Sequence, residues 1–122
     1  MGMAFAEIEL KNALYPERAG FRVKALADTG AMMLCIPSQL AARLELEAAD
    51  ERPAVLADGR RVMAPYVGPI QVNFGDRMCF VGAIVMGDEV LLGAVPMEDM
   101  DLVVSSLTRE VTTNPGPPTH RI

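Results

Sequence analysis

The chain lacks tryptophan, and aromatic residues account for only 5% of its 122 residues. Proteins that bind single-stranded nucleic acid stack the bases on aromatic side chains, so this scarcity disfavours that class of function. The net charge of −5 at pH 7 also disfavours a polyanionic partner. No apolar run reaches the roughly eighteen residues that a membrane-spanning helix needs. We therefore expect neither a nucleic-acid partner nor a membrane partner.

Histidine and cysteine are scarce as well. His120 is the only histidine, and Cys35 and Cys79 are the only cysteines. A zinc site needs three or four such ligands, and a Cys-His or Ser-His-Asp site needs a histidine outside a proline-rich tail. The two thiols are expected to be buried and reduced, with a disulfide as the less favoured alternative. No glycine-rich phosphate loop is present. The sequence therefore predicts neither a metal site nor a cofactor.

The length of the chain fits a single domain with one modest core. We expect that domain to span residues 1–113, and residues 114–122, rich in proline and polar residues, to form an extended or disordered tail. Residues 1–7 have neither a basic leader nor a long apolar region, so no secretory signal is expected. A cytoplasmic location is the resulting expectation.

Short apolar segments separated by turn residues make up most of the chain. Strands are expected over residues 4–10, 21–27, 32–36, 53–57, 60–64, 70–74, 78–86, 90–92 and 102–104. One helix is expected from Pro37, with Leu40 and Leu44 facing inward and an end before or within the acidic residues 47–51. Residues 96–101 could add one helical turn. Met32 and Met33 are expected in the core, with the lining of a pocket as the less favoured alternative. The pattern predicts an all-β barrel or folded sheet.

An Asp-Thr-Gly-Ala motif at residues 28–31 is the most informative feature of the sequence. It follows the apolar run of residues 23–27, and a Val-Leu-Leu-Gly signal lies about sixty residues later, at 90–93. Taken by itself, the motif could be a plain turn, in which the aspartate caps the turn and the glycine supplies a residue of positive φ. Its position after a strand and its order with the second signal favour a catalytic carboxylate instead.

With these two signals, the sequence resembles the retropepsin-like aspartic peptidases, in particular the small bacterial proteins of that clan. The resemblance extends from about residue 7 to residue 104. It implies a closed acid-protease barrel with one short helix, active as a homodimer on a peptide or protein substrate. Peptide hydrolysis by such enzymes needs two carboxylates, and the chain has one motif. Asp28 from each subunit would therefore meet across a two-fold axis as the catalytic pair.

The resemblance also implies roles for the neighbours of that aspartate. Thr29 would hydrogen-bond across the two-fold axis, and Gly30 would let the backbone pass close to the partner and the substrate. Ala31 matches the small residue that follows the motif in the family, and we expect it to contact substrate. At Ala94 many relatives carry arginine or another polar residue that supports the dimer. The segment expected to pack behind the turn and support the site is Leu91, Leu92 and Gly93.

The turn at Asp58 and Gly59 lies where the family places its flap, a mobile hairpin that closes over an extended peptide. Ala57, Asp58, Gly59 and Arg60 are accordingly expected to bind substrate. An exposed turn with two solvated arginines, Arg60 and Arg61, is the alternative interpretation. The flap is less rich in glycine than the flaps of viral relatives.

Three functions remain open from the sequence. The first is an active dimeric aspartic endopeptidase. The second is a non-catalytic module of the same fold that binds an extended peptide by strand addition. The third is a structural partner of another protein in which Asp28 only caps a turn. The intact motif favours the first, because a binding module has no need of the aspartate.

Overall fold

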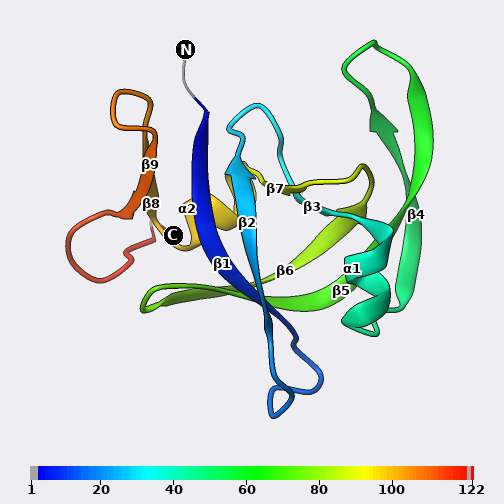
Figure 1. The fold of residues 1–122 in the computed structure, drawn as a ribbon, viewed down its shortest axis with the longest axis horizontal. Helices are drawn as coiled ribbons and strands as arrows, with labels where there is room; N and C mark the ends of the chain where they lie inside the picture. The colour runs from blue at the N-terminus through cyan, green and yellow to red at the C-terminus, as the bar shows by residue number, and fades with distance from the viewer. Residues whose placement is uncertain (1–2, 121) are drawn as a thin grey trace.

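The computed structural model describes residues 3–120 and 122. Figure 1 shows a small β structure with two short helices on its outside. The elements are β1 (Ala4–Asn12), β2 (Phe21–Ala27), β3 (Leu34–Ile36), α1 (Ser38–Arg43), β4 (Ala48–Val55), β5 (Arg61–Phe74), β6 (Arg77–Val85), β7 (Val90–Leu92), α2 (Ala94–Asp99), β8 (Leu102–Ser105) and β9 (Glu110–Thr113).

Six of these strands close into a barrel. The described strands pair in the order β1, β2, β7, β3, β6 and β5, and β5 then pairs with β1 to close the ring. β4 extends the sheet beyond β5, and the β8–β9 hairpin extends it beyond β1. This arrangement confirms the predicted all-β barrel.

The alternating pattern of the strands explains the barrel core. Along β1 the buried residues are every second one, from Ala4 to Asn12, as expected for a strand with one face inward. Each large apolar side chain that is fully buried stabilises the fold by about 1.5–3 kcal/mol. The largest such side chains include Ile8, Leu10, Leu34, Ile36, Ile70, Leu92 and Met100.

The two prolines in the middle of the chain lie within one long bent strand. We expected separate strands at residues 60–64 and 70–74, but β5 runs through both Pro65 and Pro69. Pro69 falls where the pairing of β5 with β6 shifts register, between Val67 and Ile70. Beyond this bend β5 leaves β4 and pairs with β1. The first helix ends at Arg43, before the acidic stretch of residues 47–51, as expected. Residues 48–51 belong to β4, which therefore begins earlier than the strand expected from residue 53.

The segment after the Asp-Thr-Gly motif differs from the prediction, because its backbone pairs with a helix. Only residues 34–36 of the expected strand 32–36 join the sheet. The carbonyls of Ala31 and Met32 accept hydrogen bonds from the N–H groups of Ala94 and Val95, at 2.8 and 2.9 Å. These donors belong to the first turn of α2, where helices leave N–H groups unpaired. The helix therefore begins at Ala94 rather than Pro96.

The favoured core assignment of the methionine pair is wrong for Met32, which is 66% exposed and lines the cleft described below, as the alternative had it. The same backbone bonds to α2 keep this residue out of the sheet. Met33 is half-buried and faces the cleft described below. Leu40 and Leu44 are buried, as predicted for the inward face of the first helix.

A last strand, β9, was missing from the prediction, and Arg77 connects the region that follows it to the body of the protein. Arg77 is buried, and its guanidinium donates to the carbonyls of Met100, Asp101, Asn114 and Gly116, with N–O distances of 2.6–3.2 Å. The division of the chain into a domain of residues 1–113 and a tail stays a prediction. Residues 1, 2 and 121 lie outside the described residues.

Candidate active site

Asp28 lies at the end of β2, where backbone hydrogen bonds hold it on a tight turn. Its N–H donates to the Leu92 carbonyl at 3.0 Å, and its own carbonyl accepts from the Ala31 N–H at 3.1 Å. The Gly30 N–H donates to Asp28 Oδ1 at 2.9 Å. The side chain is half-buried. These bonds hold the backbone of the turn and one oxygen of the carboxylate in place.

The 90–93 signal lies directly behind this turn. β7 is parallel to β2, with Leu91 opposite Leu26, and antiparallel to β3, with Leu91 opposite Cys35. Gly93 is buried at the point where the backbone of residues 31–33 crosses it. A Cβ atom at Gly93 would lie 2.3 Å from the Met33 carbonyl oxygen. Glycine is needed here because the two backbones are in contact.

The β4–β5 hairpin forms the opposite side of the site. Its tip is closed by the Leu56 N–H donating to the Arg60 carbonyl, at 2.8 Å, and by the Gly59 N–H donating to the Leu56 carbonyl, at 2.9 Å. Gly59 has a φ of +87°, which glycine adopts without strain. This three-residue loop is a common hairpin connection, in which a turn is followed by a residue of positive φ.

The Asp58 carboxylate stabilises the same tip. It accepts from the Arg60 N–H at 3.0 Å and from Arg60 Nε at 2.7 Å. The backbone N–H, and then the guanidinium, lower the pKa of Asp58 below its ordinary value. The Arg60 guanidinium is therefore already paired within the turn.

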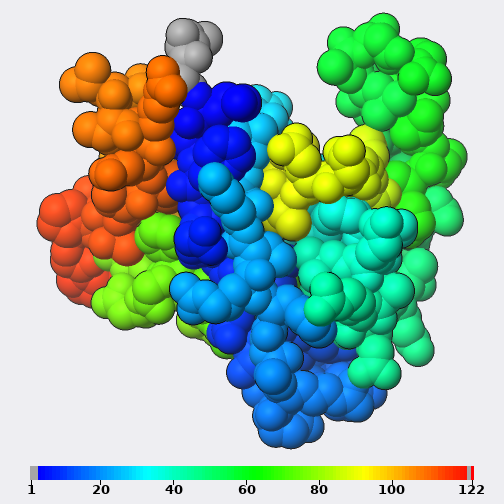
Figure 2. Space-filling model, viewed as in Figure 1, coloured from blue at the N-terminus to red at the C-terminus, as the bar shows by residue number. Residues whose placement is uncertain are grey.

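A cleft of about 680 Å³ separates the Asp28 turn from this hairpin. Figure 2 shows the hairpin, in green, standing away from the yellow segment that contains β7, with open space between them. The lining is apolar except for two charged residues, Asp28 and Arg52. It comprises Asp28, Gly30, Ala31, Met32, Met33, Cys35, Arg52, Pro53, Ala54, Val55, Leu56, Ala57, Ile84, Met86 and Leu91.

The predicted site residues divide between this cleft and its surroundings. Asp28, Gly30, Ala31, Ala57 and Leu91 line the cleft, whereas Leu92 and Gly93 lie behind the turn. The exposed remainder of the flap tip, comprising Asp58, Gly59 and Arg60, lies beyond the cleft lining.

Thr29 points away from the cleft. It is exposed and borders a separate hollow of about 330 Å³ together with Ala94, Met97 and Val104.

Two groups of cleft residues were not predicted from the sequence. Ile84 and Met86, at the end of β6, were assigned only to an apolar strand, and the strand pattern gives no sign of which end faces a cleft. Arg52 was not singled out, because it falls between the acidic residues 47–51 and the strand expected over residues 53–57 and was assigned to neither. The bulge that offsets β4 from β5 between Ala48 and Asp50 has no signature in the sequence.

A cysteine nucleophile is disfavoured by the surroundings of Cys35. This residue lines the cleft, where burial, and then the negative charge of Asp28, raise the pKa of the thiol. A cysteine nucleophile acts as the thiolate, so Cys35 is poorly suited to catalysis at neutral pH. Burial also raises the pKa of Cys79, to about 12.

Among the described residues, neither histidine nor a group of metal ligands adds to the cleft. His120 lies 3.8 Å from the Asp99 carboxylate, on α2, and is not among the cleft residues. Within residues 3–120 and 122, no three His, Cys, Asp or Glu side chains are grouped as metal ligands would be. None of the helices in the described part is long and apolar enough to cross a membrane.

Comparison with known proteins places this geometry in a family. Residues 17–99, more than half of the chain, match the family described as "gag-polyprotein putative aspartyl protease". The comparison with curated proteins found no match.

Among solved structures, the retroviral protease-like domain of Ddi1 from Leishmania major is similar, with a TM-score of 0.58 and 13% identity, over 93% of this chain and 91% of that one. The simian foamy virus protease, in a solution structure, has a TM-score of 0.48 and 16% identity, over 75% of this chain and 90% of that one. A retropepsin-like aspartic protease from Rickettsia conorii has a TM-score of 0.48 and 13% identity, over 86% of each chain. The family match, together with the fold shared with the Ddi1 domain, shows that this chain belongs to the gag-type, retropepsin-like aspartyl protease family.

Proposed function

We propose that the protein is an aspartic endopeptidase that works as a homodimer, with one Asp28 from each subunit. The observation that carries this proposal is the Asp28 carboxylate, fixed by the Gly30 N–H at 2.9 Å on the wall of an apolar cleft. The chain contains one Asp-Thr-Gly motif. A second carboxylate therefore has to come from a second copy, and the hairpin supplies the cover for an extended peptide.

The two carboxylates divide the chemistry between them. Two such groups a few ångströms apart share one proton, because both cannot be ionised at that distance. The ionised Asp28 removes a proton from a bound water, whose oxygen bonds to the peptide carbonyl carbon. The protonated Asp28 gives its proton to the carbonyl oxygen. As the C–N bond breaks, a proton reaches the leaving nitrogen, so that the products are a carboxylic acid and an amine. The two pKa values belong to the pair rather than to either residue.

One end of the molecule has the properties of a dimer face. Ala4 pairs with Ala27, so Met3 lies beside Asp28, and the β8–β9 turn is carried to the same end by the pairing of Phe5 with Glu110. Figure 1 shows the start of β1, the Asp28 turn and the β8–β9 turn at one edge of the molecule. Large apolar side chains are exposed there: Met3 by 62%, Met32 by 66%, Val95 by 39% and Leu107 by 93%.

The hollow beside Thr29 adds an apolar recess to this face. Ala94, Met97, Leu102 and Val104 line it, and Glu98 is its one charged residue. Where many relatives carry a polar residue, Ala94 here contributes to an apolar surface. We propose that burial of these side chains against the partner stabilises the dimer in place of polar contacts.

Peptide cleavage is the direct test of the proposed function. Wild type and Asp28→Asn are compared on a peptide library at mildly acidic pH, with thermal melts beside the assay. Loss of one acid–base group costs about a hundred- to ten-thousandfold, so we expect a loss of about ten-thousandfold or more when both carboxylates are replaced. The melting temperature should hold or rise, because two facing carboxylates have been removed. Equal cleavage by the two proteins would show that Asp28 is not catalytic.

The dimer face is tested by a matched pair of substitutions. Leu107→Asp places a charge on the proposed face, and Leu14→Asp makes the same change in the loop of residues 13–20, where Leu14 is 64% exposed. Each symmetric dimer would bury two copies of Leu107, so we expect its dissociation constant to rise about a hundredfold or more. Sedimentation at micromolar concentration measures this. A dimer equally stable in both variants would place the interface elsewhere.

A second candidate function is the binding of an extended peptide without cleavage. The observation that favours it is β4, which is the last strand of the sheet and is exposed over nearly its whole length. Such an edge can accept a peptide as a further strand. A peptide that binds to the wild type with unchanged length after long incubation would support this function over hydrolysis.

A further inference from the structure

Arg52 is the one cationic side chain among the described residues that line the cleft. It lies on β4, opposite Ala64 of β5. The lining that it shares with Asp28 is otherwise apolar or small, including Met33, Ile84 and Met86. A single positive charge in an apolar wall is a means of selecting one kind of ligand group, because it distinguishes a carboxylate from its neutral isostere.

The Tyr66 ring supports the Arg52 guanidinium. The guanidinium carbon lies 3.7 Å from the ring centroid, in a stacked cation–π contact. Tyr66 lies on β5 and pairs with Ile84 of β6, which itself lines the cleft. Stacking fixes the plane of the guanidinium and reduces the freedom that it loses when it binds a planar carboxylate.

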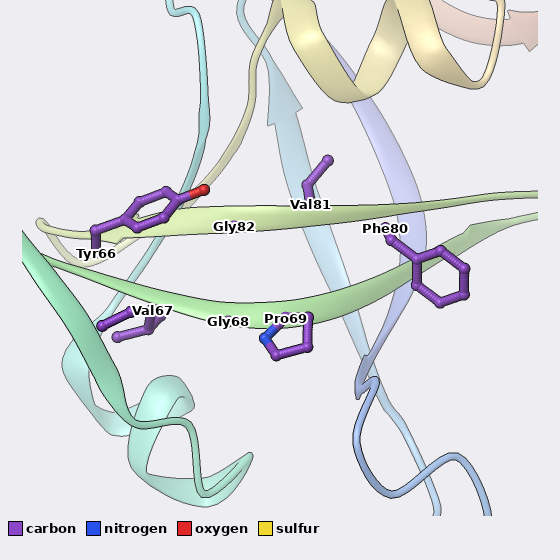
Figure 3. Close-up of a pocket in the computed structure, with 8 residues that line it drawn as sticks. Tyr66, Val67, Gly68, Pro69, Phe80, Val81 and Gly82 are labelled. Atoms are coloured by element: carbon purple, nitrogen blue, oxygen red, sulfur yellow. The ribbon is translucent and has the colours of Figure 1, made fainter.

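Gly82 makes space for that ring. Figure 3 shows Tyr66 lying across β6 at Gly82, at the border of a second, apolar hollow that includes Pro69 and Phe80. A Cβ atom at Gly82 would lie 2.1 Å from the Tyr66 hydroxyl oxygen and 2.2 Å from the ring carbon that bears it. Glycine weakens the interior of a strand. Here it permits the ring position on which Arg52 rests.

Arg52 keeps most of its hydrogen-bonding capacity for a ligand. Its Nε lies 3.6 Å from Asp50 Oδ2, which is longer than a hydrogen bond, and the two side chains are 46% and 60% exposed. An exposed pair of this kind is weak. The contact involves Nε, and a guanidinium can make a two-pronged bond to a carboxylate through its two Nη groups. By contrast, Arg60 at the hairpin tip is held by Asp58 at 2.7 Å.

We propose that Arg52 is a specificity-determining residue that binds a glutamate or aspartate side chain of the peptide in the cleft. This rests on the proposed function, which sets the position of the scissile bond at Asp28. Arg52 is four residues from Leu56 at the hairpin tip, or about 13 Å along an extended strand. The acidic residue therefore lies several residues from the scissile bond.

In the proposed dimer, the preference for an acidic residue applies on both sides of the cleaved bond. A two-fold axis through the scissile bond places a second Arg52 beyond the other end of the apolar centre. The best substrate would then be apolar at the cleaved bond and acidic on both flanks. Since the protein as a whole carries a charge of −5, such a preference requires a local cation.

Peptide binding to the Asp28→Asn protein tests this proposal without cleavage. The probes are fluorescein-labelled ten-residue peptides with an apolar centre and a single Glu or Gln, scanned from the second to the fourth residue on either side. At the matching position we expect Glu to bind about fivefold more tightly than Gln, which is the upper range for an exposed charge pair. Glu on both flanks should give roughly the square of that factor, and salt should reduce both.

Two substitutions and a matched control isolate Arg52. Arg52→Gln should abolish the discrimination, and Arg52→Glu should transfer the preference to a peptide with Lys at that position. The control is Arg18→Gln: Arg18 is also stacked on a tyrosine, Tyr15, at 3.9 Å, and also paired with an acid, Glu45, but outside the cleft lining. It should leave the discrimination unchanged.

The outcomes separate this proposal from the peptidase proposal. Equal binding of Glu and Gln peptides, or a preference that survives Arg52→Gln, would overturn the role of Arg52 even if the wild type cleaves both peptides. Discrimination that depends on Arg52 would support that role even if the wild type cleaves neither peptide. If no peptide of the set binds at millimolar concentration, both proposals fail.

Discussion

The two walls of the cleft are built in opposite ways. The Asp28 turn is held by hydrogen bonds between segments distant in sequence, from Asp28 to Leu92 and from Ala94 to Ala31. Behind it, Gly93 is buried in contact with backbone. Within the described part of the chain, the hydrogen bonds of the hairpin tip from Leu56 to Arg60 lie within the tip itself. A Cβ atom at Gly59 would meet nothing within 4 Å.

This difference suits the two walls to different tasks. A catalytic carboxylate must be held to a fraction of an ångström, because small displacements reduce the rate strongly. A cover over an extended peptide must open and close, and such segments come from the least stable parts of a fold. The contrast therefore predicts that the site combines a rigid acid–base group with a mobile lid.

Hydrogen exchange should show the largest difference between the walls. We expect the amides of residues 56–60 to exchange about a thousandfold or more faster than those of β2, because the tip opens locally while β2 opens only with the barrel. The measurement is native-state exchange followed by mass spectrometry or NMR. Equal protection of the two segments would contradict the assignment of a mobile hairpin.

Substitution of one glycine in each wall should change the free energy of unfolding by different amounts, although this effect is smaller than the difference in hydrogen exchange. Gly93 has a φ of −85°, which alanine accepts, so Gly93→Ala tests the contact with the backbone of residues 31–33. We expect a loss of about 1–3 kcal/mol in the free energy of unfolding and a decrease in activity of about a hundredfold, as the Asp28 turn shifts.

The paired variant is Gly59→Ala, which meets no neighbour but must adopt a φ of +87°. Because the exposed tip can relax, we expect a change of about 1 kcal/mol or less. Denaturant unfolding measures both variants. A larger loss for Gly59→Ala would mean that the hairpin, not the Asp28 turn, is the constrained wall.

Acidification should loosen the hairpin tip slightly. The folded-state pKa of Asp58 lies below its ordinary value of 3.8, because the Arg60 N–H and then its guanidinium stabilise the carboxylate. The stabilisation is therefore fully present above pH 3.8 and is lost as the pH falls through the lower, folded-state value. An NMR titration of Asp58 should show its inflection below 3.8. An inflection at or above 3.8 would show that the turn does not stabilise the charged form.

The sequence predicted the Asp28 wall well because its signals are local. One signal is an aspartate after an apolar run, and the other is a glycine after a second apolar run. Together they predict that the two segments pack against each other, and in the structure their backbones are in contact. The barrel followed from the alternation of apolar residues, which β1 retains along its length. Each of these properties is set by neighbouring residues in the chain.

The rest could not be predicted because it depends on pairings across the fold. Met32 is exposed because the carbonyls of Ala31 and Met32 accept hydrogen bonds from the first turn of α2 instead of joining the sheet. The sequence placed the start of that helix two residues too late. Arg52 lines the cleft with its guanidinium on the Tyr66 ring, whose position Gly82 permits. A short exposed strand of mixed charge carries little periodic signal, so the register of β4 could not be read from its residues.

Mixing of subunits is the most direct test of the central claim that each site uses Asp28 from two chains. Wild type and Asp28→Asn are combined in varying ratios, allowed to exchange subunits, and assayed for peptide cleavage at constant total protein. If only dimers with two aspartates are active, activity follows the square of the wild-type fraction, so that an equal mixture retains about one quarter of the activity. Activity proportional to the wild-type fraction, with about one half retained, would mean that each chain works alone and would contradict the account.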